Sequence, residues 1–228
     1  IVTVNASASV EAGAPQTVCA GQNASLTASG STTYEWSTTE TTQGITVTPV
    51  ATTTYLVTGT STCGTALDSV VVTVDPIPTV NAGTDVTICN GNAASLNASA
   101  TGIAINYLWS PPTGLNSTSI PNPVANLNVT TTYVLTVSNN CGTVSDDVII
   151  TVDPIPTVDA GQDFTICDGD SQTLNGSGTG VAITYSWSPS TGLSATNIPN
   201  PVANPTVTTT YVLTINNNCG TVTNDMIV

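Results

Sequence analysis

One phrase of the sequence occurs twice, and its spacing restricts the possible folds more than any other feature. Val72–Gly83 reads VTVDPIPTVNAG, and Ile150–Gly161 reads ITVDPIPTVDAG, 78 residues further along the chain. The same motifs recur in the same order around both copies: a cysteine, a Tyr-x-Trp, a Thr-Thr-Thr-Tyr, a Cys-Gly-Thr and a Val-rich run. A fixed period of this size predicts an array of similar modules instead of one large core.

The motifs delimit three modules. The predicted boundaries are 9–76, 77–154 and 155–228, and residues 1–8 match the last strand and linker of a preceding module. We expect Ile1–Val4 to reflect an excerpt from a continuous array. The alternative is that this segment completes the third module of a neighbouring copy by strand addition.

Each module is predicted to contain about seven short strands. Segments such as QTVC, ASLTASG, TYEWS and SVVVTV alternate small polar with apolar residues at period two, and Gly, Asn and Pro clusters separate them. A tryptophan on the third strand and a tyrosine opening the sixth are typical of an immunoglobulin-like sandwich. The predicted fold is therefore all-β, with three tandem immunoglobulin-like β-sandwich modules in a head-to-tail array. The predicted core residues are Trp36, Trp109, Trp187, Tyr55, Tyr133 and Tyr211.

The charge composition excludes several classes of function. The chain has no Lys, Arg or His and has 14 acidic residues. Without a basic patch, we expect neither nucleic acid nor anionic lipid as a direct partner. Without His or Lys, the usual activated nucleophiles and Schiff bases cannot form, so we expect no enzyme. No apolar stretch approaches the roughly 18 residues of a membrane span, so direct membrane insertion is not expected.

The Asp-Pro-Ile-Pro segments are predicted to be stiff joints between modules. Two prolines within three residues fix φ twice and hold the preceding residues extended. In the alternative interpretation, each proline merely ends a strand. The predicted linker residues are Asp75, Pro76, Pro78, Asp153, Pro154 and Pro156.

Longer stretches of the chain resemble a known group of proteins. The sequence AGQDFTICDGDSQTLNGSG, followed by YSWSPSTGLSATNIPNPVANPTVTTTYVLTINNNCG, is similar to the immunoglobulin-like and PKD-like repeats of very large Bacteroidota cell-surface proteins. These include the gliding-motility adhesins of type IX secretion. The chain departs from true PKD repeats, because it has WST or WSP where they carry Trp-x-Phe-Gly-Asp-Gly. The resemblance implies a secreted, extracellular array that adheres, spaces or forms filaments, with an unidentified surface or glycan ligand.

Two cysteines per module, six in total, are expected to form disulfides in a secreted chain. One possibility pairs them within modules, as Cys19–Cys63, Cys89–Cys141 and Cys167–Cys219. The strand order of the resembled sandwich places the first and last turns of a module at opposite ends. That order favours pairing between modules, as Cys19–Cys141 and Cys89–Cys219, with Cys63 and Cys167 bonding to flanking modules.

Few residues in the sequence suggest a catalytic, modification or metal-binding site. Asp146-Asp147 and the Asp168/Asp170 pair are interpreted as exposed turn residues, because nothing predicts the cleft of a glycosidase. No catalytic residue is predicted. Ser69 lies in a short Asp-Ser-aliphatic motif that resembles a Bacteroidota O-glycosylation acceptor. Acidic residues near the joints are calcium candidates, since Ca²⁺ takes oxygen ligands; they are Asp75, Asp85, Asp153, Asp163 and Asp225.

Together these features predict a structural repeat segment of an extracellular filament or adhesin that gives reach and stiffness. Its partners would be flanking modules or identical subunits of the same fibre. Three alternatives stay open: a carbohydrate-binding array with exposed aromatic platforms, a donor-strand polymerised pilus-like subunit, and the accessory stalk of an enzyme.

Overall fold

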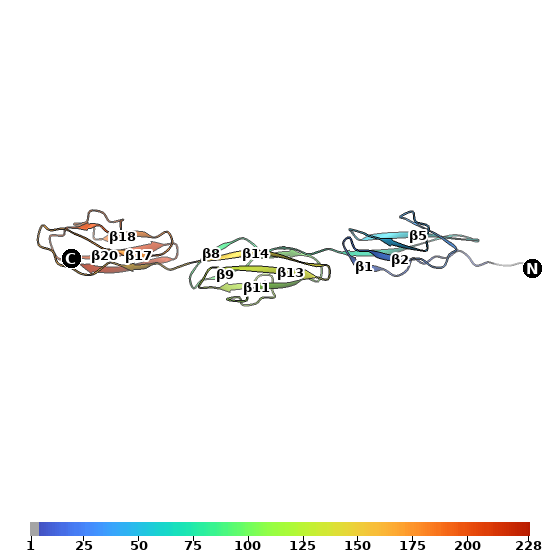
Figure 1. Ribbon diagram of the computed structural model, residues 1–228, viewed down its shortest axis with the longest axis horizontal. Helices are drawn as coiled ribbons and strands as arrows, with labels where there is room; N and C mark the ends of the chain where they lie inside the picture. Colours follow the sequence, from blue (N-terminus) through green and yellow to red (C-terminus); the bar gives the residue numbers. More distant parts are fainter. Residues whose placement is uncertain (1–4) are drawn as a thin grey trace, which may run out of the picture. The chain divides into compact units, whose positions relative to one another are not determined.

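The computed structural model describes residues 5–228, and within that range it contains strands and no helix (Figure 1). None of residues 5–228 forms a helix that could span a membrane. The strand predicted for Ile1–Val4 lies outside the described residues.

The first module forms two facing sheets. One sheet has the strand order β1-β6-β5-β3 and the other pairs β2 with β4. Strand β1 runs parallel to β6, while the remaining pairs are antiparallel. The strands are β1 (Gln16–Cys19), β2 (Ala24–Thr27), β3 (Thr33–Trp36), β4 (Gly44–Val47), β5 (Thr53–Ser61) and β6 (Gly64–Asp75).

The second module repeats this plan. Its main sheet has the order β11-β13-β14-β8, with β8 parallel to β14, and two smaller sheets pair β12 with β9 and β10 with β7. The strands are β7 (Thr79–Asn81), β8 (Val86–Cys89), β9 (Ala93–Ser95), β10 (Ser99–Thr101), β11 (Asn106–Ser110), β12 (Val124–Asn126), β13 (Thr131–Asn139) and β14 (Gly142–Asp153).

The third module keeps the order β18-β20-β21 in its main sheet, and β15-β17 and β16-β19 form the smaller ones. Phe164–Cys167, the counterpart of β8, is irregular here. The strands are β15 (Thr157–Asp159), β16 (Gln172–Thr173), β17 (Ser177–Thr179), β18 (Thr184–Ser188), β19 (Val202–Ala203), β20 (Thr210–Asn217) and β21 (Gly220–Ile227). Among the described residues, the modules thus have six, eight and seven strands. The first module has a single bridge between Glu11 and Ser29 where the second pairs β7 with β10, and the third, in the same range, has no strand that corresponds to β8.

The period-two pattern places one side of each long strand in the core. In β5, Tyr55 and Val57 are buried while Leu56 between them is 47% exposed. Trp36, Trp109 and Trp187 are at most 2% exposed, and the indole nitrogen of Trp36 donates to the Thr42 carbonyl at 3.1 Å. No polar or charged residue is buried among the described residues. The cores are therefore apolar, and the indole keeps a hydrogen-bond partner.

The chain divides into two compact units, and the division does not follow the repeat. The first unit reaches Asn81 and includes Ala98–Trp109 and Leu135–Asp146. The second comprises Ala82–Asn97, Ser110–Val134 and Asp147–Val228. Each Asp-Pro-Ile-Pro segment therefore lies in the same compact unit as the Cys-Gly turn of the module that comes after it in the sequence. The module boundaries predicted from the repeat stay predictions.

Candidate functional site: the joints between modules

Two disulfides link residues of successive modules. Cys19 is bonded to Cys141 across 122 residues, and Cys89 is bonded to Cys219 across 130 residues. The Cα atoms of each pair are 5.3 Å apart, within the usual range for a disulfide. The structure therefore has the pairing between modules and not the pairing within them.

A parallel strand pair brings the first cysteine to the joint. Strand β1 lies beside the end of β6, with Cys19 opposite Asp75, and the Ala20 N–H donates to the Asp75 carbonyl at 3.2 Å. In the second module, β8 lies beside β14 in the same way, with Cys89 opposite Asp153. Each cysteine is thus held next to the residue that begins the linker, where the following module enters.

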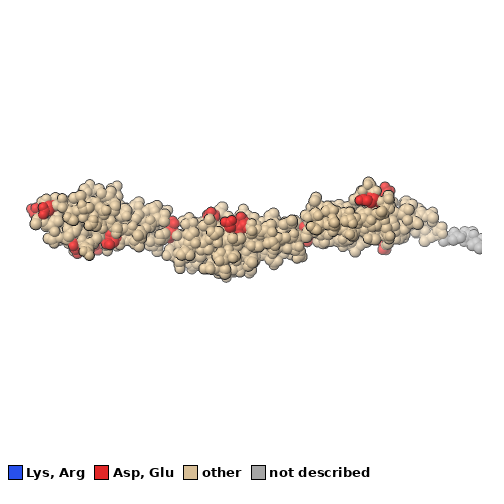
Figure 2. All heavy atoms as spheres, in the orientation of Figure 1, with Lys and Arg blue, Asp and Glu red and all other residues tan. Residues whose placement is uncertain are grey.

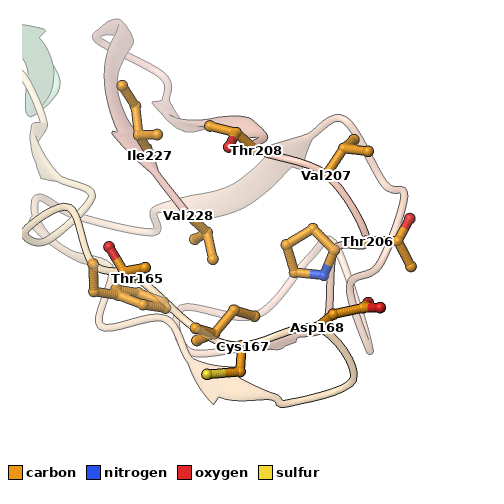
Figure 3. Close-up of a pocket in the computed structure, with 11 residues that line it drawn as sticks. Thr165, Cys167, Asp168, Thr206, Val207, Thr208, Ile227 and Val228 are labelled. Carbon is orange, nitrogen blue, oxygen red and sulfur yellow. The ribbon is translucent and has the colours of Figure 1, made fainter.

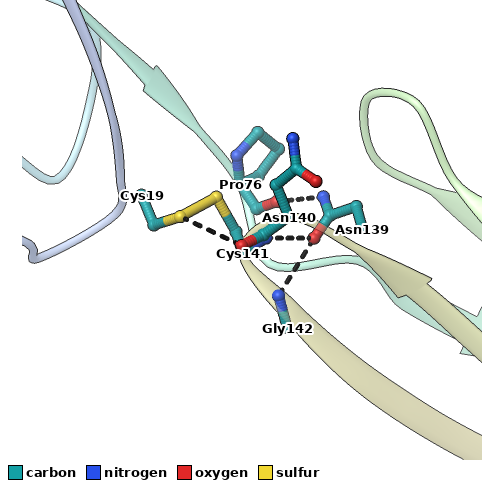
Figure 4. Close-up of a disulfide and its surroundings, with 6 residues drawn as sticks. All are labelled: Cys19, Pro76, Asn139, Asn140, Cys141 and Gly142. Atoms are coloured by element: carbon teal, nitrogen blue, oxygen red, sulfur yellow. Dashed lines mark hydrogen bonds between the residues drawn. A yellow bond between two sulfur atoms is a disulfide. The ribbon is translucent and has the colours of Figure 1, made fainter.

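The second cysteine of each bond sits on the β-hairpin turn of the following module. At the first joint, this turn lies between β13 and β14 and carries Asn139, Asn140, Cys141 and Gly142 (Figure 4). The Asn139 side-chain oxygen accepts the N–H groups of Cys141 at 2.8 Å and Gly142 at 3.1 Å. The amide therefore fixes the turn that presents the cysteine.

The same asparagine also reaches the linker. Its side-chain nitrogen donates to the Pro76 carbonyl at 2.9 Å, as Figure 4 shows. A methyl group placed on Gly142 would lie 3.2 Å from Cγ2 of Ile77, so the linker isoleucine lies directly against the turn. The joint therefore combines a covalent bond, an amide hydrogen bond and an apolar contact.

The second joint repeats this arrangement. Asn217 donates to the Pro154 carbonyl at 3.1 Å and accepts the Cys219 N–H at 2.8 Å. The middle residue of each linker, Ile77 or Ile155, is 51% exposed, while Pro78 and Pro156 are buried. The second proline of each linker is consequently packed into the protein and does more than end a strand.

The first module differs at its own Cys-Gly turn. Ser61 stands where the other modules have Asn139 and Asn217, and its hydroxyl accepts the Cys63 N–H at 3.2 Å. The serine thus preserves the turn but has no amide nitrogen to donate. Cys63 is exposed and unbonded, as is Cys167 of the third module. Bonds from these two cysteines to flanking modules stay a prediction.

Two of the acidic residues near the joints hydrogen-bond to the backbone. The carboxylates of Asp85 and Asp163 accept the N–H groups of Ile149 at 2.9 Å and Ile227 at 2.8 Å. Among residues 5–228, no group of three or more acidic, Cys or His side chains is arranged to hold a metal. Asp75 and Asp153 end β6 and β14, and Asp225 lies within β21. Calcium binding by these residues stays a prediction.

The predicted turn aspartates differ in their positions: Asp168 lies in a turn and Asp170 directly after it, and both are exposed as expected. Asp146 and Asp147 belong to β14 and are not the turn residues that the sequence suggested, because the hairpin strand continues past them. Asp68 on β6 accepts the Ala12 N–H at 2.7 Å. That hydrogen bond, followed by one from Ser69, holds the pKa of Asp68 below its ordinary value. Ser69 is exposed on β6, and its glycosylation stays a prediction.

The aromatic side chains do not form a platform. All nine Trp and Tyr residues lie in the described range, and none of them is exposed. Burial raises the pKa of both Tyr133 and Tyr211, and the Tyr211 hydroxyl donates to the Thr191 carbonyl at 2.7 Å. Figure 2 shows small groups of acidic side chains on a face that is otherwise uncharged. A carbohydrate site built from stacked aromatics therefore has no support in this structure.

Comparison with known proteins establishes the fold. No protein-family model matches the chain, and no curated protein matches its sequence. A structure of three immunoglobulin domains of titin, a Glu-to-Ala variant, matches 97% of this chain and 98% of its own with a TM-score of 0.57 and 14% identity. A titin I-band fragment matches 93% of this chain and 94% of its own with a TM-score of 0.56 and 13% identity. The predicted fold of three tandem immunoglobulin-like β-sandwich modules is thereby confirmed.

Proposed function

We propose that this chain is a structural repeat segment of an extracellular surface filament or adhesin, and that its joints hold successive modules at a set geometry. The function is mechanical: the segment supplies reach and stiffness, while ligand binding would belong to other surfaces or domains. The tandem immunoglobulin-like fold supports the structural part of the proposal, because such modules form arrays in which each contacts its neighbours.

The observation that carries the proposal is the bonding of Cys19 to Cys141 beside the Asn139–Pro76 hydrogen bond. A proline-rich linker alone already restricts the chain. A disulfide placed next to it adds a second covalent connection between the same two modules, which restricts bending about the linker more than the linker alone does. Both contacts recur at the second joint, which supports assigning them to the repeat.

Two further features support an extracellular location. Disulfides persist in oxidising compartments and are rare in reducing ones. The chain has 14 acidic residues and no Lys or Arg. Its surface is therefore negatively charged and repels copies of itself at long range. The proposed partners are flanking modules or identical subunits of the same fibre, and they engage at the joints. The resemblance to Bacteroidota surface repeats suggests the source and is part of the proposal.

Residual dipolar couplings of the full chain test the proposal. With the disulfides oxidised, the amides of β5 and β13 should fit a single alignment tensor, because the first joint does not bend. After reduction, the same amides should require separate tensors of different magnitude. Separate tensors in the oxidised protein would refute the mechanical role, since the bond would then leave the joint free to move.

A further inference from the structure

Two Asn-Gly dipeptides occur in the chain, and their surroundings differ. Asn90-Gly91 directly follows Cys89 of the second disulfide, whereas Asn175-Gly176 lies between the short strands β16 and β17. Asparagine is a chemically labile residue, and it loses its side-chain amide most readily before glycine, which has no side chain to shield its own backbone nitrogen. The packing around each dipeptide therefore decides whether it reacts.

Asn90 and Gly91 form the tip of an exposed turn. Asn92 donates its N–H to the Cys89 carbonyl at 2.9 Å, which closes the turn. Gly91 has a φ of +86°, the positive value that the third position of a type II turn requires. Both tip residues are exposed, and a methyl group placed on Gly91 would meet no atom within 4 Å. Nothing therefore packs against the tip or hinders rotation of the Asn90 side chain.

The backbone nitrogen of Gly91 is less restrained than its counterpart in the first module. There, Gly21 donates its N–H to the Pro49 carbonyl at 3.0 Å. Within residues 5–228, Gly91 has no such backbone acceptor. Its nitrogen is therefore available as a nucleophile once it is deprotonated.

The second dipeptide is packed against the core of the third module. Gly176 is buried, and a methyl group placed on it would lie 2.7 Å from the Pro199 carbonyl oxygen and 2.7 Å from Cζ2 of Trp187. Ring closure requires the Asn175 side chain and the Gly176 backbone to rotate toward each other, and this packing opposes that rotation. Asn175-Gly176 is thus a control with the same dipeptide in a rigid setting.

We propose that Asn90 is a site of spontaneous deamidation in the folded protein and that Asn175 is protected from it. The Gly91 nitrogen loses its proton and attacks Cγ of Asn90, the side-chain amide leaves as ammonia, and a five-membered succinimide remains. Water then opens the ring at Cγ to give aspartate, or at the backbone carbonyl to give isoaspartate. One water is consumed and one ammonia is released, without any change in oxidation state.

The repeat itself contains the aspartate product. Asp168 lies beside Cys167 at the same position in the third module, as Figure 3 shows, and the Asp170 N–H closes that turn on the Cys167 carbonyl at 3.0 Å. Aspartate is therefore compatible with the turn. Isoaspartate instead lengthens the backbone of the turn by one carbon, so the hydrogen bond that closes it cannot keep its geometry.

The reactive position is next to the second joint and has no equivalent at the first. The Asn90 N–H donates to the carbonyl of Asp153, the residue that begins the second linker, at 2.9 Å. In the first module Ala20 stands at this position and cannot react. Deamidation therefore adds a negative charge beside the Cys89–Cys219 bond and leaves the surroundings of Cys19–Cys141 unchanged.

Digestion of the full chain with Asp-N reports both products. The protein, with its disulfides intact, is kept in mildly alkaline buffer, and samples are reduced and digested over time. Unmodified chain gives a fragment that begins at Asp85, ends before Asp146 and contains Asn90. Aspartate at position 90 creates a new Asp-N site within this fragment, whereas isoaspartate resists cleavage and is located by tandem mass spectrometry. The fragment that begins at Asp170 contains Asn175 and supplies the comparison.

We expect Asn90 to be modified several-fold faster than Asn175 in the folded chain. In denaturant both should react at similar rates, because packing no longer distinguishes them. Asn90→Ala, which reproduces Ala20 of the first module, should remove the modification at position 90 and leave the behaviour of Asn175 unchanged. Equal rates at the two positions in the folded chain, or an Asn90 that stays intact while the denatured chain reacts, would overturn the proposal.

Discussion

The side-chain nitrogen of Asn139 lies 2.9 Å from the carbonyl oxygen of Pro76, although 63 residues separate the two in the sequence. The same asparagine holds the turn that carries Cys141. One side chain therefore orients both the disulfide and the linker at the first joint.

Replacement of Asn139 by Asp separates these two tasks. The carboxylate keeps the acceptor for the Cys141 and Gly142 N–H groups but cannot donate to Pro76. We expect a loss of about 0.5–1.5 kcal/mol in the free energy of unfolding and divergent dipolar-coupling tensors for β5 and β13. Asn140→Asp is the matched control, because it adds the same charge at the adjacent turn position. Equal effects of both variants would show that charge alone matters.

Removal of the first disulfide should uncouple two modules. In Cys19→Ser the closure of a 122-residue loop is lost, and loops of that size are worth about 5 kcal/mol in the chain-entropy model. We expect calorimetry to show the first two modules unfolding in separate transitions at lower temperature. Cys63→Ser, which changes an unbonded cysteine, should leave the unfolding profile intact. An unchanged profile for Cys19→Ser would mean that the bond adds no coupling.

The stability of the first module should depend on pH through Asp68. Because folding lowers the pKa of this carboxyl, its ionised form stabilises the module above the unfolded-state pKa, and the contribution disappears as pH falls through the folded-state pKa. Asn224 accepts the Ala160 N–H at 2.8 Å in the third module, so an amide can fill the role. Asp68→Asn should therefore fold normally and reduce the dependence of melting temperature on pH below 5. An identical acid profile would rule out this carboxylate as the cause.

The buried tyrosines should set an alkaline limit. Burial raises the pKa of Tyr211, so the neutral phenol stabilises the fold below the unfolded-state pKa, and this contribution is lost as pH rises through the folded-state pKa. Tyr211→Phe removes the hydrogen bond to Thr191 and should cost about 1 kcal/mol at neutral pH. Above pH 10 the variant should lose less stability than the parent chain. Chemical denaturation at both pH values measures the difference, and parallel losses would contradict it.

Much of the fold follows from local patterns. Alternation of Val and Leu with Thr and Ser predicts strands such as β5 and β6, and the repeat predicts the number of modules. The parallel pairing of β1 with β6 could not be read from the chain, because pairing partners far apart in sequence depend on the tertiary fold. Its consequence, the pairing of Cys19 with Cys141, was favoured only through the strand order of a resembled family.

The joints were predicted in part. The linker prolines and the six cysteines are visible in the sequence, but the role of Asn139 and Asn217 was missed. A signal was present, since both later modules read Asn-Asn-Cys-Gly where the first reads Ser-Thr-Cys-Gly. Asp85 and Asp163 were singled out as calcium candidates, and the structure adds that their carboxylates accept backbone N–H groups. Sequence alone cannot distinguish these uses, because both require an exposed carboxylate near a strand end.

Mapping of the disulfides under non-reducing conditions tests the central claim most directly. Asp-N and chymotrypsin are suitable, because the chain has no Lys or Arg for trypsin. The account predicts linked peptides that contain Cys19 with Cys141 and Cys89 with Cys219. Linked peptides that join Cys19 with Cys63 and Cys89 with Cys141 would contradict it, since each module would then be closed on itself and the joints would depend on proline alone.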